Sequence, residues 1–240
     1  MDDQKLSRIL PKVYRSLFTR YGPQHWWPAK SPFEVMVGAI LTQSAAWTNV
    51  EKAIENLKKA GALSPNVLRQ LPQDELARLI HSCGYYNIKA RKLKAFAEWF
   101  GEKYDDNLDR LFAQDINDLR RQLLDVYGIG EETADSIILY AGNKPIFVID
   151  TYTRRIISRM GLAPHSNSYS AYQTLFTANL PADARLFNEY HALLVRLAKE
   201  VCRTRPLCQQ CCLNPGGKAV SDPTSGRFPC AKFIKNNKKL

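Results

Sequence analysis

The chain has 240 residues, of which 45% are hydrophobic and 24% are charged, so it can bury a sizeable core and is too apolar for a disordered protein. Its 34 Lys and Arg outnumber its 23 Asp and Glu, and the formal net charge of +11 favours a polyanionic partner. The longest apolar stretch, residues 35–41, is far shorter than the roughly 20 residues that span a bilayer, and no signal peptide is recognisable. We therefore expect a cytoplasmic protein, a monomer without a membrane partner.

Apolar residues recur every three or four positions along most of the chain, which is the pattern of amphipathic helices. Residues 23–32 interrupt the pattern with three prolines and are expected to form a loop. No segment alternates polar and apolar residues long enough to indicate a sheet, so we expect an all-α fold. The expected helices cover residues 6–20, 33–43, 47–60, 73–82, 88–104, 115–126, 131–141, 151–160, 168–179 and 185–201.

The helix expected over residues 88–104 is rich in cations, which we expect on its outer face. These cations are Lys89, Arg91, Lys92 and Lys94. Glycines and prolines between the earlier helices indicate short loops, because both residue types interrupt helical structure. The loop residues are Gly61, Pro65, Pro72 and Gly84.

A glycine-rich turn joins the two helices on either side of residues 126–130. Gly128 and Gly130 permit the positive φ and close backbone approach that a tight turn needs, with Ile129 between them. Backbone N–H groups at the start of the second helix, near Thr133, can bind a phosphate without reading a base. The turn is thus either a DNA-binding hairpin or a plain connection between two helices.

Asp150 follows a short apolar run, residues 146–149, and precedes an expected helix. An aspartate at this position is typical of an N-cap, which accepts a hydrogen bond from a backbone N–H of the first turn. A capping carboxylate that faces a DNA groove can also stabilise positive charge on a sugar. The two roles are compatible.

Five of the six cysteines suggest a metal site near the C-terminus. In a reducing compartment a cysteine cluster indicates metal before disulfides, and only Cys83 stands apart from this one. Thiolate ligands at this spacing fit a [4Fe–4S] cluster or zinc, with no metal as the third alternative. The expected ligands are Cys202, Cys208, Cys211 and, as the fourth, either Cys212 or Cys230. We favour Cys230, because adjacent cysteines rarely reach the same metal.

The hairpin, Asp150 and the cysteine cluster together resemble the helix-hairpin-helix DNA glycosylases of the endonuclease III superfamily, over about residues 30–212. This resemblance implies base excision repair of duplex DNA that contains a damaged base, with Asp150 as the essential aspartate. Bifunctional members carry a nucleophilic lysine where this chain has Glu132, which implies a monofunctional glycosylase that leaves an abasic site. The family's cluster motif has one more residue in its first gap than this chain has.

The tryptophans and Gln43 are similar to the 3-methyladenine DNA glycosylase III branch. Enzymes that act on a base rotate it out of the duplex, and aromatic side chains can receive it by stacking. The branch has a stacking aromatic residue where Trp47 stands, and Gln43 matches the residue that fills the gap left by the flipped base. Trp26 and Trp27 complete the expected pocket, unless the tryptophans only pack the seam between two subdomains.

Lys199 matches a modified, carbamylated lysine of that branch, although an ordinary exposed lysine is the simpler interpretation. The branch as typified lacks a metal cluster, whereas endonuclease III has one, so this chain mixes features of both. An alkylated adenine is cationic, and stacking with cation–π attraction could select it.

The expected architecture has two lobes. Residues 33–142 form a helical domain with the hairpin at about 115–141, and residues 1–32 with 143–240 form a second lobe with the cysteine cluster at 202–230. Trp26, Trp47, Glu132 and Asp150 are expected to converge in the cleft. The favoured function is a monofunctional glycosylase for alkylated bases. The alternatives are an endonuclease III-type glycosylase and AP lyase for oxidised pyrimidines, and a non-catalytic helix-hairpin-helix DNA-binding module.

Overall fold

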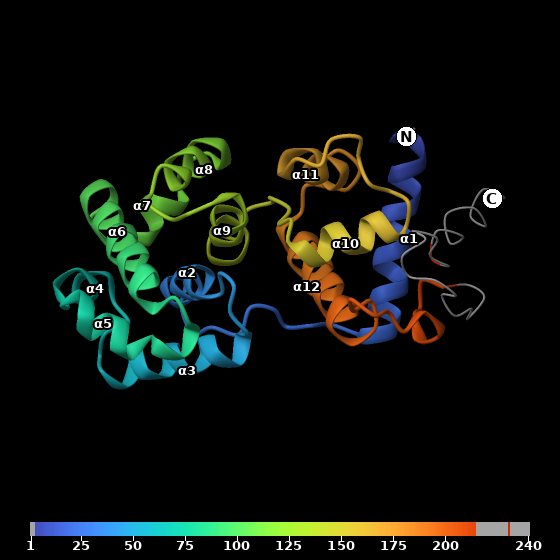
Figure 1. Cartoon of the computed structure of the whole chain (residues 1–240). Helices are drawn as coiled ribbons and strands as arrows, with labels where there is room; N and C mark the ends of the chain where they lie inside the picture. The colour runs from blue at the N-terminus through green and yellow to red at the C-terminus, as the bar shows by residue number, and fades with distance from the viewer. Residues whose placement is uncertain (1–2, 215–229, 231–240) are drawn as a thin grey trace. The chain divides into compact units, whose positions relative to one another are not determined.

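The computed structural model of the chain describes residues 3–214 and Cys230, and these residues contain helices and no strand (Figure 1). The expected all-α fold class is therefore confirmed. The chain divides into two compact units: Met1–Trp26 with Pro145–Leu240, and Trp27–Lys144. No helix in the described part of the chain is long and apolar enough to cross a membrane.

The unit Trp27–Lys144 is built around α2 (Pro32–Leu41), in which every residue after Pro32 is buried. An apolar helix without a polar face is stable only where other helices surround it. The elements that contact α2 are α3 (Trp47–Lys59), α6 (Tyr86–Tyr104), α9 (Glu131–Ser136) and the π-helix η2 (Ile137–Ala141). The same unit also contains α4 (Pro65–Gln70), α5 (Gln73–Leu79), the 3-10 turn η1 (His81–Cys83), α7 (Leu108–Phe112) and α8 (Ile116–Leu124).

In its described residues, the other unit contains four helices and a 3-10 turn, and an aromatic cluster lies in its core. The rings of Phe147 and Phe176 stack with centroids 3.9 Å apart, and Tyr190 meets both of them edge-on. The buried hydroxyl of Tyr190 donates to the carbonyl of Leu10, which ties two helices together. The elements are α1 (Asp3–Tyr21), α10 (Thr151–Arg159), α11 (Tyr169–Thr177), α12 (Ala184–Glu200) and η3 (Cys208–Gln210).

The sequence predicts that Pro65 lies in a loop. In the structure Pro65 instead begins the short helix α4. A proline at the first helical position loses no hydrogen bond and has a φ that already suits a helix. Ser64 precedes it as the N-cap, and its hydroxyl accepts from the backbone N–H of Val67. The prediction was wrong because it read the proline as a helix breaker regardless of position.

Lys89 is not on the outer face of α6, because only 2% of it is exposed. Its Nζ donates to the carbonyl of Leu41 at 2.9 Å and to that of Cys83 at 2.8 Å. Both carbonyls stand at helix C-termini, where no intrahelical donor is available. Burial lowers the pKa of Lys89. Of the four cations expected on the outer face, only Arg91 is exposed.

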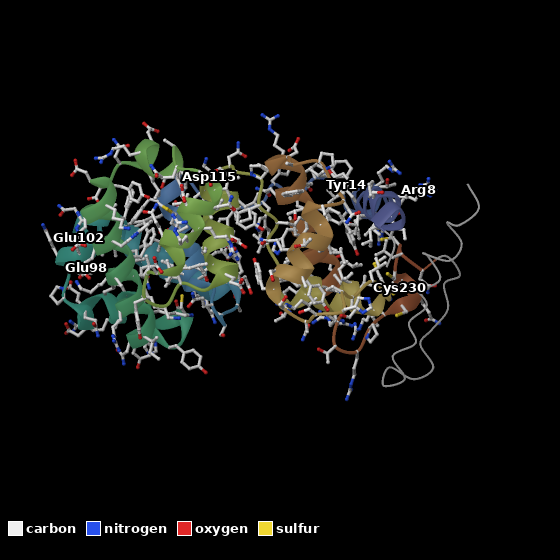
Figure 2. The ribbon with its side chains drawn as sticks, turned by 90° about the horizontal axis from the view of Figure 1, so that it is seen from above. Arg8, Tyr14, Glu98, Glu102, Asp115 and Cys230 are labelled. Carbon is white, nitrogen blue, oxygen red and sulfur yellow. The ribbon has the colours of Figure 1, made fainter. Side chains whose placement is uncertain are left out.

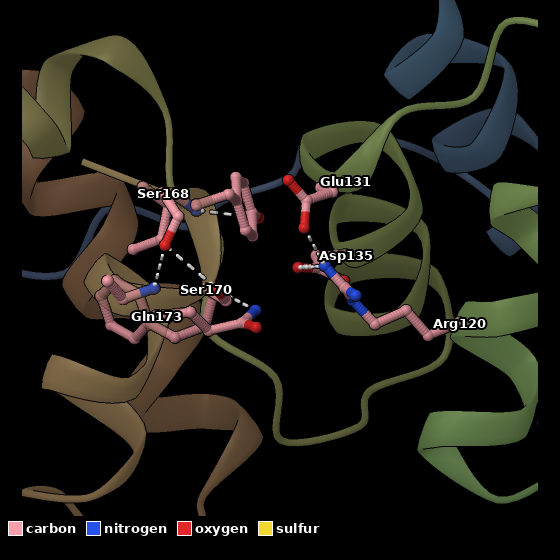
Figure 3. Close-up of polar contacts among 10 residues, drawn as sticks. Arg120, Glu131, Asp135, Ser168, Ser170 and Gln173 are labelled. Atoms are coloured by element: carbon pink, nitrogen blue, oxygen red, sulfur yellow. Dashed lines mark hydrogen bonds and ion pairs between the residues drawn. The ribbon is translucent and has the colours of Figure 1, made fainter. Parts of the chain in front are cut away.

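An ion pair closes the hairpin between α8 and α9 (Figure 3). Arg120 on α8 donates from Nε to Asp135 Oδ1 at 2.7 Å and from Nη2 to Glu131 Oε1 at 3.2 Å. The Asp135 side chain is fully buried, whereas 22% of the Arg120 side chain is exposed. A buried carboxylate is costly unless a cation and hydrogen bonds compensate it, so Arg120 fixes α9 against α8.

We expect Arg120→Met to lower the free energy of unfolding by about 3–5 kcal/mol, because it leaves the buried Asp135 carboxylate without this cation. The matched control is Arg121→Met, since Arg121 pairs with Asp118 in a bridge whose side chains are 71% and 52% exposed. That control should change stability by no more than about 0.5 kcal/mol. Urea denaturation of both variants measures the difference, and equal losses would contradict the role of Arg120.

Candidate active site

Asp150 is the N-cap of α10, as its position after an apolar run predicts. Its Oδ1 accepts from the backbone N–H of Thr153 at 2.6 Å, and 12% of its side chain is exposed. Helix α11 holds the preceding segment: the Ile149 N–H donates to the Tyr169 hydroxyl, and Gln173, labelled in Figure 3, donates to the Phe147 carbonyl. Helix α11 thus holds the segment that leads to Asp150, and the backbone of α10 holds one oxygen of its carboxylate.

His191 on α12 lies beside Asp150 and was not recognised from the sequence. Its Nε2 lies 3.7 Å from Asp150 Oδ2, and 7% of its side chain is exposed. Burial lowers the pKa of His191, and the negative charge of Asp150 opposes this effect only in part. The sequence signal was a histidine within an otherwise apolar helix face, which core packing explains equally well.

The hairpin turn is held from outside by Gln43. The Gln43 side-chain amide donates to the Gly128 carbonyl at 3.0 Å and to the Thr133 hydroxyl at 2.9 Å. Lys92 on α6 donates to the Oε1 of the same amide. Ile129 is buried, and its N–H donates to the Val126 carbonyl. Gln43, Ile129 and Thr133 thus take part in contacts inside the unit, and their expected DNA contacts stay predictions.

An exposed aromatic and a cation stand at the edge of this turn. Tyr127 is 48% exposed, and the guanidinium of Arg91 lies 4.9 Å from the centre of its ring. Tyr127 directly precedes Gly128, so the turn presents positive charge beside its backbone. This arrangement suits a phosphate.

Three aromatic side chains meet in the unit Trp27–Lys144. Trp27 is perpendicular to Trp47, with ring centroids 5.1 Å apart, and its centroid lies 5.3 Å from that of Tyr140. Gly38 allows this approach, because a Cβ there would stand 3.1 Å from the Trp27 ring. Tyr140 was not foreseen, since it belongs to the π-helix η2, and such helices are often found at functional sites.

The remaining residues expected at the site belong to different parts of the structure. Trp26 is the last residue of its segment of one unit, and Trp27 is the first of the other. Glu132 is exposed in the first turn of α9, and Lys199 is exposed in the last turn of α12. The expected convergence of Trp26, Trp47, Glu132 and Asp150 stays a prediction, and so does the modification of Lys199.

One small cavity is lined by the four expected cysteine ligands, Cys202, Cys208, Cys211 and Cys230 (Cys230 is labelled in Figure 2). Cys212 does not line it. Burial raises the pKa of Cys211 and Cys230 to about 12. Within residues 3–214 and Cys230, no three His, Cys, Asp or Glu side chains stand at metal-binding geometry. The donor set, four sulfurs around one cavity, nevertheless suits a sulfur-ligated group.

Residues 37–182 match the HhH-GPD superfamily of base excision DNA repair proteins. A Methanocaldococcus jannaschii protein described as a DNA repair glycosylase is 42% identical over 88% of this chain and 96% of its own length. Endonuclease III of Sulfolobus acidocaldarius is 28% identical over 76% of this chain and 79% of its own length.

Two solved structures share the fold. A 3-methyladenine DNA glycosylase of H. pylori bound to 1,N6-ethenoadenine has a TM-score of 0.69 and 25% identity, over 83% of this chain and 98% of that one. An endonuclease III–DNA covalent intermediate has a TM-score of 0.73 and 21% identity, over 88% of this chain and 93% of that one. The expected two-lobed glycosylase fold is therefore confirmed.

We expect Gly128→Ala to destabilise the hairpin by about 1–3 kcal/mol, because a side chain is strained in the left-handed region. Gly128 has a φ of +79°, and a Cβ there would stand 2.4 Å from the Lys92 side chain. Gly130 has a φ of −98°, and a Cβ added there would meet no atom within 4 Å, so Gly130→Ala is the matched control. Thermal and urea unfolding of both variants test the difference, and equal stability would contradict it.

Proposed function

Because the chain belongs to the HhH-GPD superfamily of base excision DNA repair proteins, we propose that it is a monofunctional DNA glycosylase for alkylated bases in duplex DNA. It is a base excision repair glycosylase by family. The proposal adds the substrate class, hydrolysis without strand cleavage, and action as a monomer. The single observation that carries it is Glu132, which is exposed in the first turn of α9 directly after the hairpin.

This chain resembles the endonuclease III superfamily, and bifunctional members of that superfamily carry their nucleophilic lysine at the position of Glu132. An amine is needed to form the Schiff base that precedes β-elimination, and a carboxylate cannot form one. Water is then the nucleophile, and the product is an abasic site in an unbroken strand. Asp150 supplies the carboxylate that such a reaction needs.

The aromatic cluster supports an alkylated base as the substrate. Trp27, Trp47 and Tyr140 offer π-faces and edges within one unit, and an electron-rich ring attracts a cationic base over a neutral one. The H. pylori 3-methyladenine glycosylase, at 25% identity, supports the same substrate class. The exposed Arg91 beside the turn and the net charge of +11 support binding to the DNA backbone.

In the proposed reaction the N-glycosidic bond breaks, and its electron pair leaves with the base. A cationic base becomes neutral as it departs, so no general acid is required. Positive charge develops on the sugar, and the Asp150 carboxylate stabilises it electrostatically. Water adds to C1′ and gives up a proton to Asp150 or to solvent. Since Asp150 Oδ1 accepts from the Thr153 N–H, we assign the stabilisation of the sugar and the acceptance of the proton to Oδ2.

The test compares base release from a duplex treated with a methylating agent and from a thymine-glycol duplex. We expect release from the first, no borohydride-trapped adduct with an abasic-site duplex, and a loss of at least about 100-fold in Asp150→Asn. Glu132→Lys should begin to form the trapped adduct, because it places an amine after the hairpin. Efficient trapping by the unaltered protein would contradict the proposal.

A second candidate function is an endonuclease III-type glycosylase and AP lyase for oxidised pyrimidines. The cysteine-lined cavity and the 28% identity to an endonuclease III favour it. Release from the thymine-glycol duplex together with trapping would select it. A chain that binds duplex and releases no base from either substrate would instead be a non-catalytic DNA-binding module.

We also propose that Cys202, Cys208, Cys211 and Cys230 hold a [4Fe–4S] cluster, with zinc as the alternative. When bound, the group would hold the segment 202–211 and Cys230 together, a structural role. Arg159, which donates to Cys202 Sγ at 3.2 Å, is the cation beside these sulfurs. The proposed enzymatic steps do not pass through this group.

We expect the purified protein to be brown, with about four iron atoms per chain. Cys230→Ser should lose iron and thermal stability, because it removes a ligand, whereas Cys212→Ser should keep both, since Cys212 lies outside the cavity. Elemental analysis and thermal unfolding of the two variants measure this. A colourless protein with one zinc would replace the cluster assignment, and equal iron loss in both variants would reject Cys230 as the fourth ligand.

A further inference from the structure

We propose that His191 is a positioning residue that holds Asp150 Oδ2 with a neutral imidazole, through its Nε2–H. The inference rests on the proposed function of Asp150 as the catalytic carboxylate. It adds a residue that the hairpin and aspartate motif does not contain.

The two oxygens of Asp150 have different partners. Oδ1 is fixed by the Thr153 N–H at 2.6 Å, and Oδ2 faces His191 Nε2 at 3.7 Å. The second distance exceeds the roughly 3 Å of an ordinary N–H···O hydrogen bond. Catalytic hydrogen bonds are often long without substrate and shorten in the reacting complex. His191 therefore stands where a small movement forms the second hydrogen bond of the carboxylate.

The surroundings of His191 favour a neutral ring. Its side chain is 7% exposed, and that of Asp150 is 12% exposed, so water screens neither group well. Burial is the largest influence on the pKa of His191 and lowers it, while the Asp150 carboxylate is the charged group that acts in the opposite direction. At pH 7 the imidazole is thus expected to carry no net charge.

A neutral partner matters because of what Asp150 must do. A cation beside Oδ2 would form an ion pair and cancel much of the negative charge that stabilises the sugar. A neutral N–H donor fixes the direction of the carboxylate and leaves its charge in place. This function differs from that of a histidine that only fills the core between α10 and α12, and two measurements separate the alternatives.

The first measurement needs no substrate. The chain has four histidines, so ¹⁵N-detected imidazole signals can be resolved, and those of His191 are identified by their loss in His191→Gln. We expect the neutral Nε2–H tautomer at pH 7 and a clear shift of its signals in Asp150→Asn. A neutral Nδ1–H tautomer, a charged ring, or signals that Asp150→Asn leaves in place would overturn the inference.

The second measurement uses base release from the methylated duplex, with kcat and KM taken from multiple-turnover kinetics. His191→Leu removes the donor and should lower kcat by about ten- to hundredfold, with KM and thermal stability little changed. His191→Gln keeps an N–H at a similar reach and should recover most of that loss. His165→Leu, which alters an exposed histidine of the same unit, is the control and should match the unaltered protein.

Full kcat in His191→Leu would overturn the inference, and so would equal losses in the Leu and Gln variants accompanied by lower thermal stability. Failure of the proposed function gives a different result. In that case the unaltered protein releases no base from methylated DNA, while the imidazole signals still report whether His191 Nε2–H faces Asp150.

Discussion

The hydrogen bond from the Thr153 N–H to Asp150 Oδ1 is the interaction on which the proposed chemistry depends. It begins α10 and holds one of the two carboxylate oxygens in place. The N-terminus of a helix also favours negative charge, so capping and charge stabilisation act in the same direction. Because the backbone holds Oδ1, any further control of the carboxylate must act on Oδ2, and the side chain there is His191.

The hairpin depends on contacts from outside its own sequence. Helix α9 and the π-helix η2 that continues it cover only residues 131–141, and a helix that short is marginal alone. Arg120 fixes it against α8, and the Gln43 amide spans the turn from the Gly128 carbonyl to Thr133. The turn is thus held as a rigid element before any DNA is bound, which reduces the ordering that binding would require.

Features encoded locally could be predicted from the sequence. The hairpin follows from two glycines between apolar helices, and the capping role of Asp150 follows from an aspartate at the end of an apolar run. Lys89, Tyr140 and His191 could not be assigned in this way, because their roles depend on partners distant in the chain. Lys89 shows this plainly: its neighbours suggested a cationic surface, but its ammonium caps the carbonyl of Leu41, 48 residues away.

In the proposed function Glu132 has two separate consequences: it removes the lyase route, and it favours a cationic base. The first is chemical, since a carboxylate cannot form a Schiff base. The second is electrostatic: a glutamate in place of a lysine changes the local charge by two, from positive to negative. A negative charge attracts a cationic alkylated base, whereas an oxidised pyrimidine is neutral and gains nothing from it. Glu132 and Tyr140 lie about two turns apart along the continuous helix α9–η2, so a single element carries both the charge and one of the aromatic rings of the proposed pocket.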